Sequence, residues 1–180
     1  MKKTLALAVT AAFLATPAFA ADVKIGVLLG FTGPIESLTP DMASGAELAM
    51  KEASESGAFM GGSKIISVRG DSTCVDAAAA TATAERLITA DGVSAIMGAD
   101  CSGVTTAVLQ NVALAKGVVM ISPSATSPAL STVEDNGLFF RTSPSDARQG
   151  QVLAEILKEK GVKSAAISYT NNDYGKGLAA

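Results

Sequence analysis

Hydroxyl side chains gather in two turns of the sequence, and each turn directly follows a short apolar run. The first turn, residues 100–103, follows the apolar residues 95–98, and the second turn, residues 122–128, follows residues 118–121. Hydroxyls and free amides at the start of a helix can hold a carboxylate without a fully buried counter-charge. The two turns therefore predict a binding site for a small molecule with an anionic group.

The residues between the two turns predict how they are positioned. Val104, Ala107, Val108 and Val112 recur at helical spacing, so a crossover helix should join two parallel strands. Parallel strands joined in this way present the turns at their carboxyl ends at one edge of the sheet, where open α/β folds bind ligands. We expect Ser102 to cap the crossover helix.

The pattern also allows a purely structural interpretation of both turns. Serine and threonine are common as helix caps and as turn residues. Ser102 is then a plain cap and Thr126 a plain turn residue, and the sequence pattern leaves this alternative open.

Strand and helix patterns alternate along the rest of the chain, which predicts an α/β fold. Asp41 and Asp76 are the expected starts of two helices, and a third helix with Leu153, Ile156 and Leu157 on one face follows residue 146. The predicted strands are residues 23–29, 64–69, 95–98, 118–121, 138–141 and 164–169.

The beginning of the chain predicts export. Lys2 and Lys3 precede the apolar residues 5–14, and residues 18–20 read Ala-Phe-Ala, which suits a signal peptidase. The alternative, a membrane anchor, needs about 20 apolar residues, and this run is shorter. We expect export and cleavage after Ala20.

Composition argues against several functions. The chain has no histidine, so it offers neither a Ser-His-Asp triad nor a histidine metal site. Its net charge of −3 and lack of a basic cluster argue against nucleic acid. Gly26, Gly30 and Gly33 do not have the spacing of a dinucleotide-binding loop. We therefore expect a protein that is not an enzyme and needs no cofactor or metal.

The two cysteines, Cys74 and Cys101, have two interpretations. In an exported protein, two cysteines usually pair as a disulfide. The alternative is a free, reactive thiol.

Several motifs, in this order, resemble the periplasmic leucine/isoleucine/valine binding protein family, the solute receptors of ABC transporters for branched-chain amino acids. The resemblance covers essentially the whole chain after residue 20. The motifs are residues 24–27 followed by 30–34, then 45–49, 71–74, 98–102, 121–128, 140–142 and 173–177.

The resemblance implies a bilobal type I periplasmic binding fold: a Rossmann-like parallel sheet with helices on both faces in each lobe, truncated here in the second lobe. The implied domains are a signal peptide (1–20), the first lobe (21–140), an interlobe crossing (141–146) and the start of the second lobe (147–180). It also implies a disulfide between Cys74 and Cys101 beside the cleft.

The resemblance implies a ligand site as well. Ser102 and Thr126 would hold the ligand carboxylate, and the backbone of Ser124 would lie close to the ligand's amino or other polar group. Tyr174 would face the ligand from the second lobe, although it could equally be a packing aromatic. The implied set is Ser102, Ser124, Ala125, Thr126, Tyr174 and Leu38.

Leu38 stands where branched-chain receptors carry an aromatic residue, so the pocket could suit another ligand. An amino acid, an aromatic or other small carboxylate and an amide all stay open. The expected function is a periplasmic receptor that delivers its ligand to an inner-membrane ABC permease. The alternatives are a ligand-sensing ectodomain and, third, an α/β enzyme.

Overall fold

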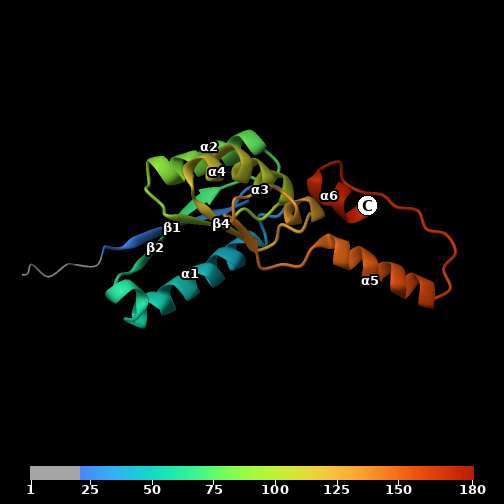
Figure 1. Cartoon of the computed structure of the whole chain (residues 1–180), viewed down its shortest axis with the longest axis horizontal. Helices are drawn as coiled ribbons and strands as arrows, with labels where there is room; N and C mark the ends of the chain where they lie inside the picture. Colours follow the sequence, from blue (N-terminus) through green and yellow to red (C-terminus); the bar gives the residue numbers. More distant parts are fainter. Residues whose placement is uncertain (1–20) are drawn as a thin grey trace, which may run out of the picture.

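A computed structural model describes residues 21–180, so the predicted signal peptide lies outside the described residues. Five parallel strands form one sheet in the order β2-β1-β3-β4-β5 (Figure 1). The strands are β1 (Val23–Leu29), β2 (Ile65–Asp71), β3 (Ala95–Gly98), β4 (Val119–Ser122) and β5 (Phe139–Arg141). The predicted α/β fold with a parallel sheet is confirmed.

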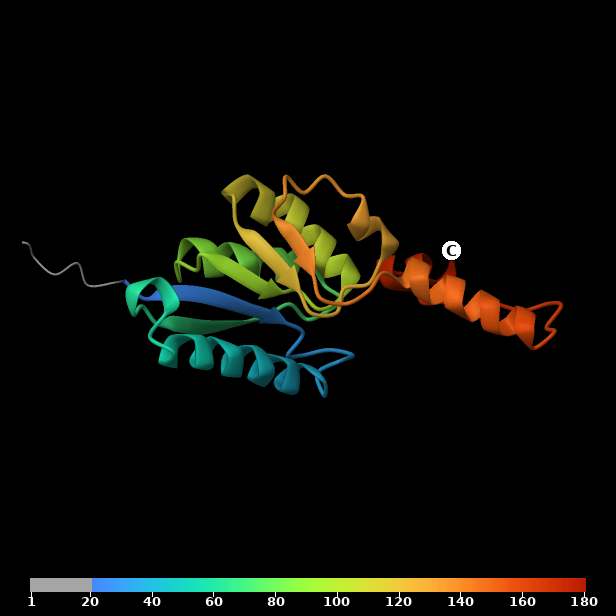
Figure 2. The same cartoon turned by 60° about the horizontal axis from the view of Figure 1, so that its bottom comes forward.

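Helices cover both faces of this sheet. Helix α1 lies on one face, and α2 lies on the other together with the continuous run of α3, η2 and α4 (Figure 2). The helical elements are α1 (Thr39–Glu55), η1 (Phe59–Gly61), α2 (Ala77–Thr89), α3 (Ser102–Val108), the π-helical η2 (Leu109–Ala113), α4 (Leu114–Lys116), η3 (Pro128–Ser131), α5 (Asp146–Glu159) and α6 (Asp173–Ala179).

Alternation along β1 divides the core into two layers. Val27 and Leu29 pack against Ala43 of α1, whereas Leu28 points to the opposite face and joins the larger cluster with Leu87. This follows from the period of two in a strand, where successive side chains point to opposite faces. Both faces of the carboxyl half of β1 are buried, which explains its apolar sequence there.

The face that α1 covers becomes open towards β4 and β5. Val27, Met97, Ile121 and Phe140 form one cross-strand row in the sheet. Val27 is fully buried under α1, whereas Ile121 is 45% and Phe140 is 53% exposed. The sheet thus carries uncovered apolar side chains at its β5 edge.

Of the three expected helix starts, the one at Asp76 is confirmed and those at Asp41 and Ser102 are corrected. Asp76 caps α2, because its carboxylate accepts the amides of Ala78 and Ala79 at 2.9 and 3.0 Å. Helix α1 starts at Thr39, ahead of Asp41, because Pro40 suits a first helical turn. The expected cap at Ser102 is wrong: Cys101 has the extended backbone of the cap, and Ser102 is the first helical residue.

The chain beyond β5 differs most from the prediction. Residues 164–169 form no strand, since no described strand lies alongside them and an unpaired strand lacks the ladder that stabilises it. Helix α5 forms as expected and extends away from the sheet (Figure 2), with Leu153 54% and Ile156 41% exposed. Among the described helices, none has the length and apolar character to cross a membrane.

Candidate functional site

The two hydroxyl-rich turns meet at the carboxyl edge of the sheet. The Ser124 hydroxyl donates to the carbonyl oxygen of Asp100 at 2.9 Å. The amide of Ser127 donates to the Ser102 hydroxyl oxygen at 3.1 Å. The turn after β3 and the turn after β4 are therefore hydrogen-bonded to each other.

Ser102 is a buried residue at the start of α3. Its oxygen accepts the Ser127 amide, and within residues 21–180 no acceptor is found for its hydroxyl proton or its own amide. The first backbone bond of α3 runs from Thr105 to Cys101. The amides of Ser102 and Gly103 precede that bond, so both are donors at the positive end of the helix.

The Thr126 hydroxyl donates a hydrogen bond within the protein, whereas the Ser102 hydroxyl oxygen accepts one. The hydroxyl donates to a carboxylate oxygen of Asp146, the first residue of α5, at 2.7 Å, and the Asp146 amide donates to the Thr126 carbonyl at 2.9 Å. Asp146 is only 3% exposed. Since a hydroxyl has one proton, the Thr126 oxygen has lone pairs left to accept but no proton to donate.

Ala125 contributes through its backbone, because the residue is fully buried. Its amide donates to the Ser122 hydroxyl oxygen at 2.9 Å. Its carbonyl accepts the Arg141 guanidinium at 3.2 Å, and the same nitrogen donates to the Ser127 carbonyl at 2.9 Å. Arg141, which the sequence analysis does not assign to the site, thus fixes the shape of the second turn.

The disulfide between Cys74 and Cys101 is present, with 5.2 Å between the Cα atoms. It ties the turn after β2 to the residue that caps α3. Gly98, the last residue of β3, precedes the turn that contains Cys101. Its φ is +137°, and a Cβ there would lie 2.1 Å from the Leu28 carbonyl oxygen. Glycine is therefore required where β3 enters the turn.

Asp100 is a second residue that the sequence analysis leaves without a role. It is 2% exposed, and its carboxylate accepts hydrogen bonds from three different turns. A single aspartate within a polar turn carries no local signal of such a role, because two of its donors lie 28 and 70 residues away.

Asp71 is a second carboxylate at this edge that accepts several hydrogen bonds. Burial acts to raise the pKa of Asp71, but hydrogen bonds from the Thr32 hydroxyl and the amides of Thr73, Thr32 and Phe31 outweigh it and lower the pKa. The Thr32 hydroxyl lies 2.6 Å from a carboxylate oxygen. This ion therefore links the turns after β1 and β2.

The structure does not bring Leu38 into this hydrogen-bonded group. Leu38 lies in the turn between β1 and α1, immediately before the first residue of α1, and is 55% exposed. Its backbone bonds connect only to Ile35 and Met42 in the same segment.

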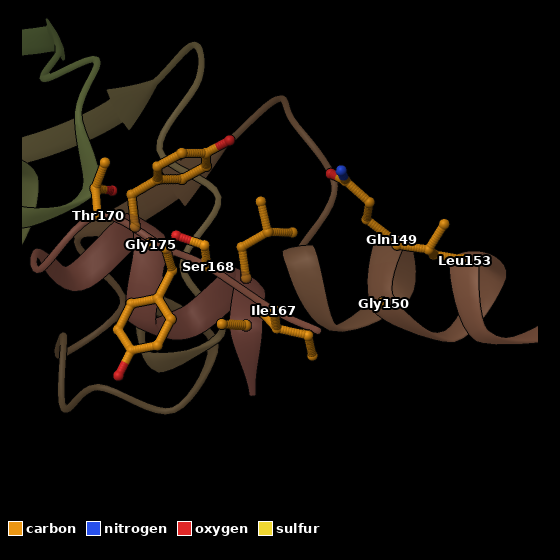
Figure 3. Close-up of a pocket in the computed structure, with 11 residues that line it drawn as sticks. Gln149, Gly150, Leu153, Ile167, Ser168, Thr170 and Gly175 are labelled. Carbon is orange, nitrogen blue, oxygen red and sulfur yellow. The ribbon is translucent and has the colours of Figure 1, made fainter. Parts of the chain in front are cut away.

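Tyr174 lies on α6, which packs against α3 and η3. A Cβ on Gly177 would lie 2.7 Å from the Pro128 ring, so this helix closely approaches the second turn. Tyr174 itself lines a different space, a largely apolar cavity of about 350 Å³ between α5, residues 167–170 and α6. Figure 3 shows Gln149 and Leu153 of α5 at one side of it and Ile167 and Ser168 nearer α6.

These groups can hold a small molecule through hydrogen bonds. The edge presents hydroxyls, amides and carbonyls, and the only cysteines are joined in a disulfide. Within residues 21–180, no group of three or more histidine, cysteine, aspartate or glutamate side chains is arranged to hold a metal ion.

Comparison with known proteins gives one family. The family model described as periplasmic binding protein matches residues 22–180. The Leu/Ile/Val-binding protein of Citrobacter freundii is 33% identical over 167 residues, which are 92% of this chain and 44% of that protein. This chain therefore spans less than half of the length of that relative.

Two solved structures are similar in fold and sequence. The ABC transporter substrate-binding protein of Desulfitobacterium hafniense in complex with Leu has a TM-score of 0.72 and 32% identity, over 88% of this chain and 45% of that one. The branched-chain amino acid transporter substrate binding protein of Streptococcus pneumoniae in complex with isoleucine has a TM-score of 0.73 and 28% identity, over 88% and 44%.

Proposed function

Because this chain belongs to the periplasmic binding protein family, we propose that it is the solute receptor of an ABC importer and that its ligand is an α-amino acid. The receptor is exported, with cleavage after Ala20, and acts in the periplasm. It delivers its ligand to an inner-membrane permease. The names of the similar proteins, which describe substrate binding and not catalysis, support this proposal.

The choice of an α-amino acid rests on one observation: within the protein, the Ser102 hydroxyl accepts a hydrogen bond and the Thr126 hydroxyl donates one. The Ser102 oxygen accepts a protein amide, so its proton is left to donate to an anion. The Thr126 proton is used on Asp146, so its oxygen is left to accept from a cation. An α-amino acid carries an anionic carboxylate beside a cationic ammonium, and a plain carboxylate carries only the first.

In this account the ligand carboxylate binds the Ser102 hydroxyl and the amides of Ser102 and Thr126. The amino group binds the Thr126 hydroxyl oxygen and backbone carbonyl groups near Ser124 and Ala125. The side chain of the ligand then extends towards Leu38. Leucine is smaller than an aromatic residue, so Leu38 leaves room that an aromatic side chain would fill.

Capture involves no bond cleavage. Residues 21–140 form the first lobe, residues 141–146 cross over, and residues 147–180 begin the second lobe. Closure moves Tyr174 from the cavity beside α5 to the ligand. A ligand that contacts both lobes binds the closed form better than the open form, so it shifts the population towards closure. The permease then recognises the closed form.

A thermal-shift screen of the complete mature protein tests this proposal. The panel comprises aliphatic and acidic amino acids, small amides and aromatic carboxylates. A ligand at 100 times its Kd adds about 2.7 kcal/mol to the free energy of unfolding. We expect the melting temperature to rise with an amino acid. A rise only with aromatic carboxylates or amides would contradict the ligand class, and no rise after unfolding and refolding to remove bound ligand would contradict the receptor function.

A further inference from the structure

The turns at the carboxyl edge of the sheet converge on one buried carboxylate, that of Asp100. We propose that Asp100 is the positioning residue of the ligand site: it fixes the Asp100–Cys101 peptide and thereby holds Ser102 in the orientation that binds the ligand. This inference rests on the proposed function, because the site that it positions is the proposed amino acid site.

The carboxylate oxygens of Asp100 divide their donors between separate turns. One oxygen accepts the amide of Gly30, after β1, at 2.7 Å. The other accepts the Ser72 hydroxyl, after β2, at 3.1 Å and the amide of Cys101 at 3.0 Å. The Ser124 hydroxyl, after β4, donates to the Asp100 carbonyl at 2.9 Å. Asp100 therefore joins the turns that follow four of the five strands.

The bond to Cys101 is the one that acts on Ser102. Cys101 caps α3, and its amide lies in the peptide between Asp100 and itself. When Asp100 fixes that amide, it fixes the direction in which the chain enters α3. That direction sets where the Ser102 hydroxyl and amide point.

An aspartate is chemically required for this arrangement. Asp100 is 2% exposed, and among residues 21–180 no lysine or arginine pairs with it. Its charge is therefore stabilised by the converging donors. Asparagine has the same shape but only one side-chain oxygen, so its NH₂ group would face either the Gly30 amide or the Cys101 amide, a donor against a donor.

A double-mutant cycle on the complete mature protein tests the inference, with L-leucine as the probe and calorimetry as the measurement. We expect Asp100→Asn to weaken leucine binding about tenfold when Ser102 is present. In the Ser102→Ala background, the same change should weaken binding by clearly less, about threefold, because the Ser102 hydroxyl is gone and only the amide remains to be positioned. Equal losses in both backgrounds would overturn the positioning role.

Hydrogen exchange of the ligand-free protein gives a readout that does not depend on leucine binding. Asp100→Asn should speed exchange of the Cys101 amide, which loses its carboxylate acceptor, whereas unchanged exchange would overturn the inference. Asp71→Asn is the matched control, since Asp71 also joins two turns at this edge but does not contact Cys101. We expect this control to leave exchange at Cys101 unchanged, and faster exchange there would contradict a specific role of Asp100.

A second variant covers the case in which Asp100→Asn does not fold. Ser124→Ala removes only the hydrogen bond to the Asp100 carbonyl. In the same cycle, Ser124→Ala should weaken leucine binding more when Ser102 is present than in the Ser102→Ala background. An equal loss of affinity in both backgrounds would contradict the inference. The two claims can fail separately. If the wild type does not bind leucine, the leucine-binding function is contradicted. If Asp100→Asn still speeds exchange in that case, the positioning role of Asp100 is supported.

Discussion

The hydroxyl of Thr126 and the carboxylate of Asp146 form a hydrogen bond of 2.7 Å, and the Asp146 amide returns a second bond of 2.9 Å to the Thr126 carbonyl. Thr126 belongs to the turn after β4, and Asp146 is the first residue of α5. The pair thus joins the proposed ligand site to the helix that begins the proposed second lobe. A displacement of α5 would act directly on Thr126, the residue proposed to accept a hydrogen bond from the ligand's amino group.

Thr126→Val tests this pair because it keeps the shape of the side chain and removes the hydroxyl. Asp146 would lose a donor while still buried, and the ligand would lose an acceptor. We expect amino acid binding to weaken about 10- to 100-fold by calorimetry. Thr132→Val is the control, since the exposed Thr132 hydroxyl contacts only the Ala129 carbonyl. Similar affinities of the two variants would contradict the role of Thr126.

Two neighbouring phenylalanines of β5 should differ in their contribution to stability. Phe139 is 7% exposed and packs in the larger core cluster, whereas Phe140 is 53% exposed. We expect Phe139→Ala to lower the free energy of unfolding by about 3 to 5 kcal/mol. Phe140→Ala should cost less than about 1 kcal/mol in the chain of residues 21–180. Urea denaturation of this chain measures both, and equal losses would contradict the described burial.

The disulfide between Cys74 and Cys101 should stabilise the fold substantially. The cysteines are 27 positions apart, and closing a loop of this size contributes about 3 to 4 kcal/mol in the chain-entropy model. We expect a double change of both cysteines to serine to lower the free energy of unfolding by this amount. Denaturation under oxidising conditions measures it, and a loss below about 1 kcal/mol would show that the loop is already constrained in the unfolded state.

Asp71 predicts a pH dependence with a definite sign. The pKa of Asp71 in the folded state is lowered from 3.8, so folding favours the ionised form. Its contribution is complete above the unfolded pKa of 3.8 and is lost as pH falls through the folded value. Relative to Asp71→Asn, the wild type should keep a constant advantage in melting temperature from pH 7 to about pH 5 and lose it in acid below pH 3.8. An advantage that grows in acid would contradict the assignment.

The sequence predicts those features that depend on local patterns. The limits of β1 agree with the prediction because its residues 25–29 form an unbroken apolar run that is buried at its carboxyl half. Asp76 is identified as a cap because its partners, Ala78 and Ala79, follow within three residues. The meeting of the two turns at one edge follows from the connection rule for parallel strands.

Other features depend on partners far along the chain. The role of Asp100 is not predicted from the sequence, because its donors Gly30 and Ser72 are distant in sequence. The cap of α3 is Cys101 and not Ser102, because the backbone conformation there is set by contacts across several turns. Residues 164–169 have the composition of a strand, but a strand also needs a neighbour, and residues 21–180 supply none beside them.

The most direct test of the central claim is a comparison of two ligands that differ only in the amino group. Calorimetry of the complete mature protein with L-leucine and with 4-methylpentanoate, which has the same side chain and carboxylate, isolates the proposed contact with Thr126. The account predicts that leucine binds at least about 100-fold more tightly, since removing the amino group leaves the Thr126 oxygen without its donor. Equal affinities for the two compounds would show that the site recognises only the carboxylate, and would contradict the proposed contact between the amino group and Thr126.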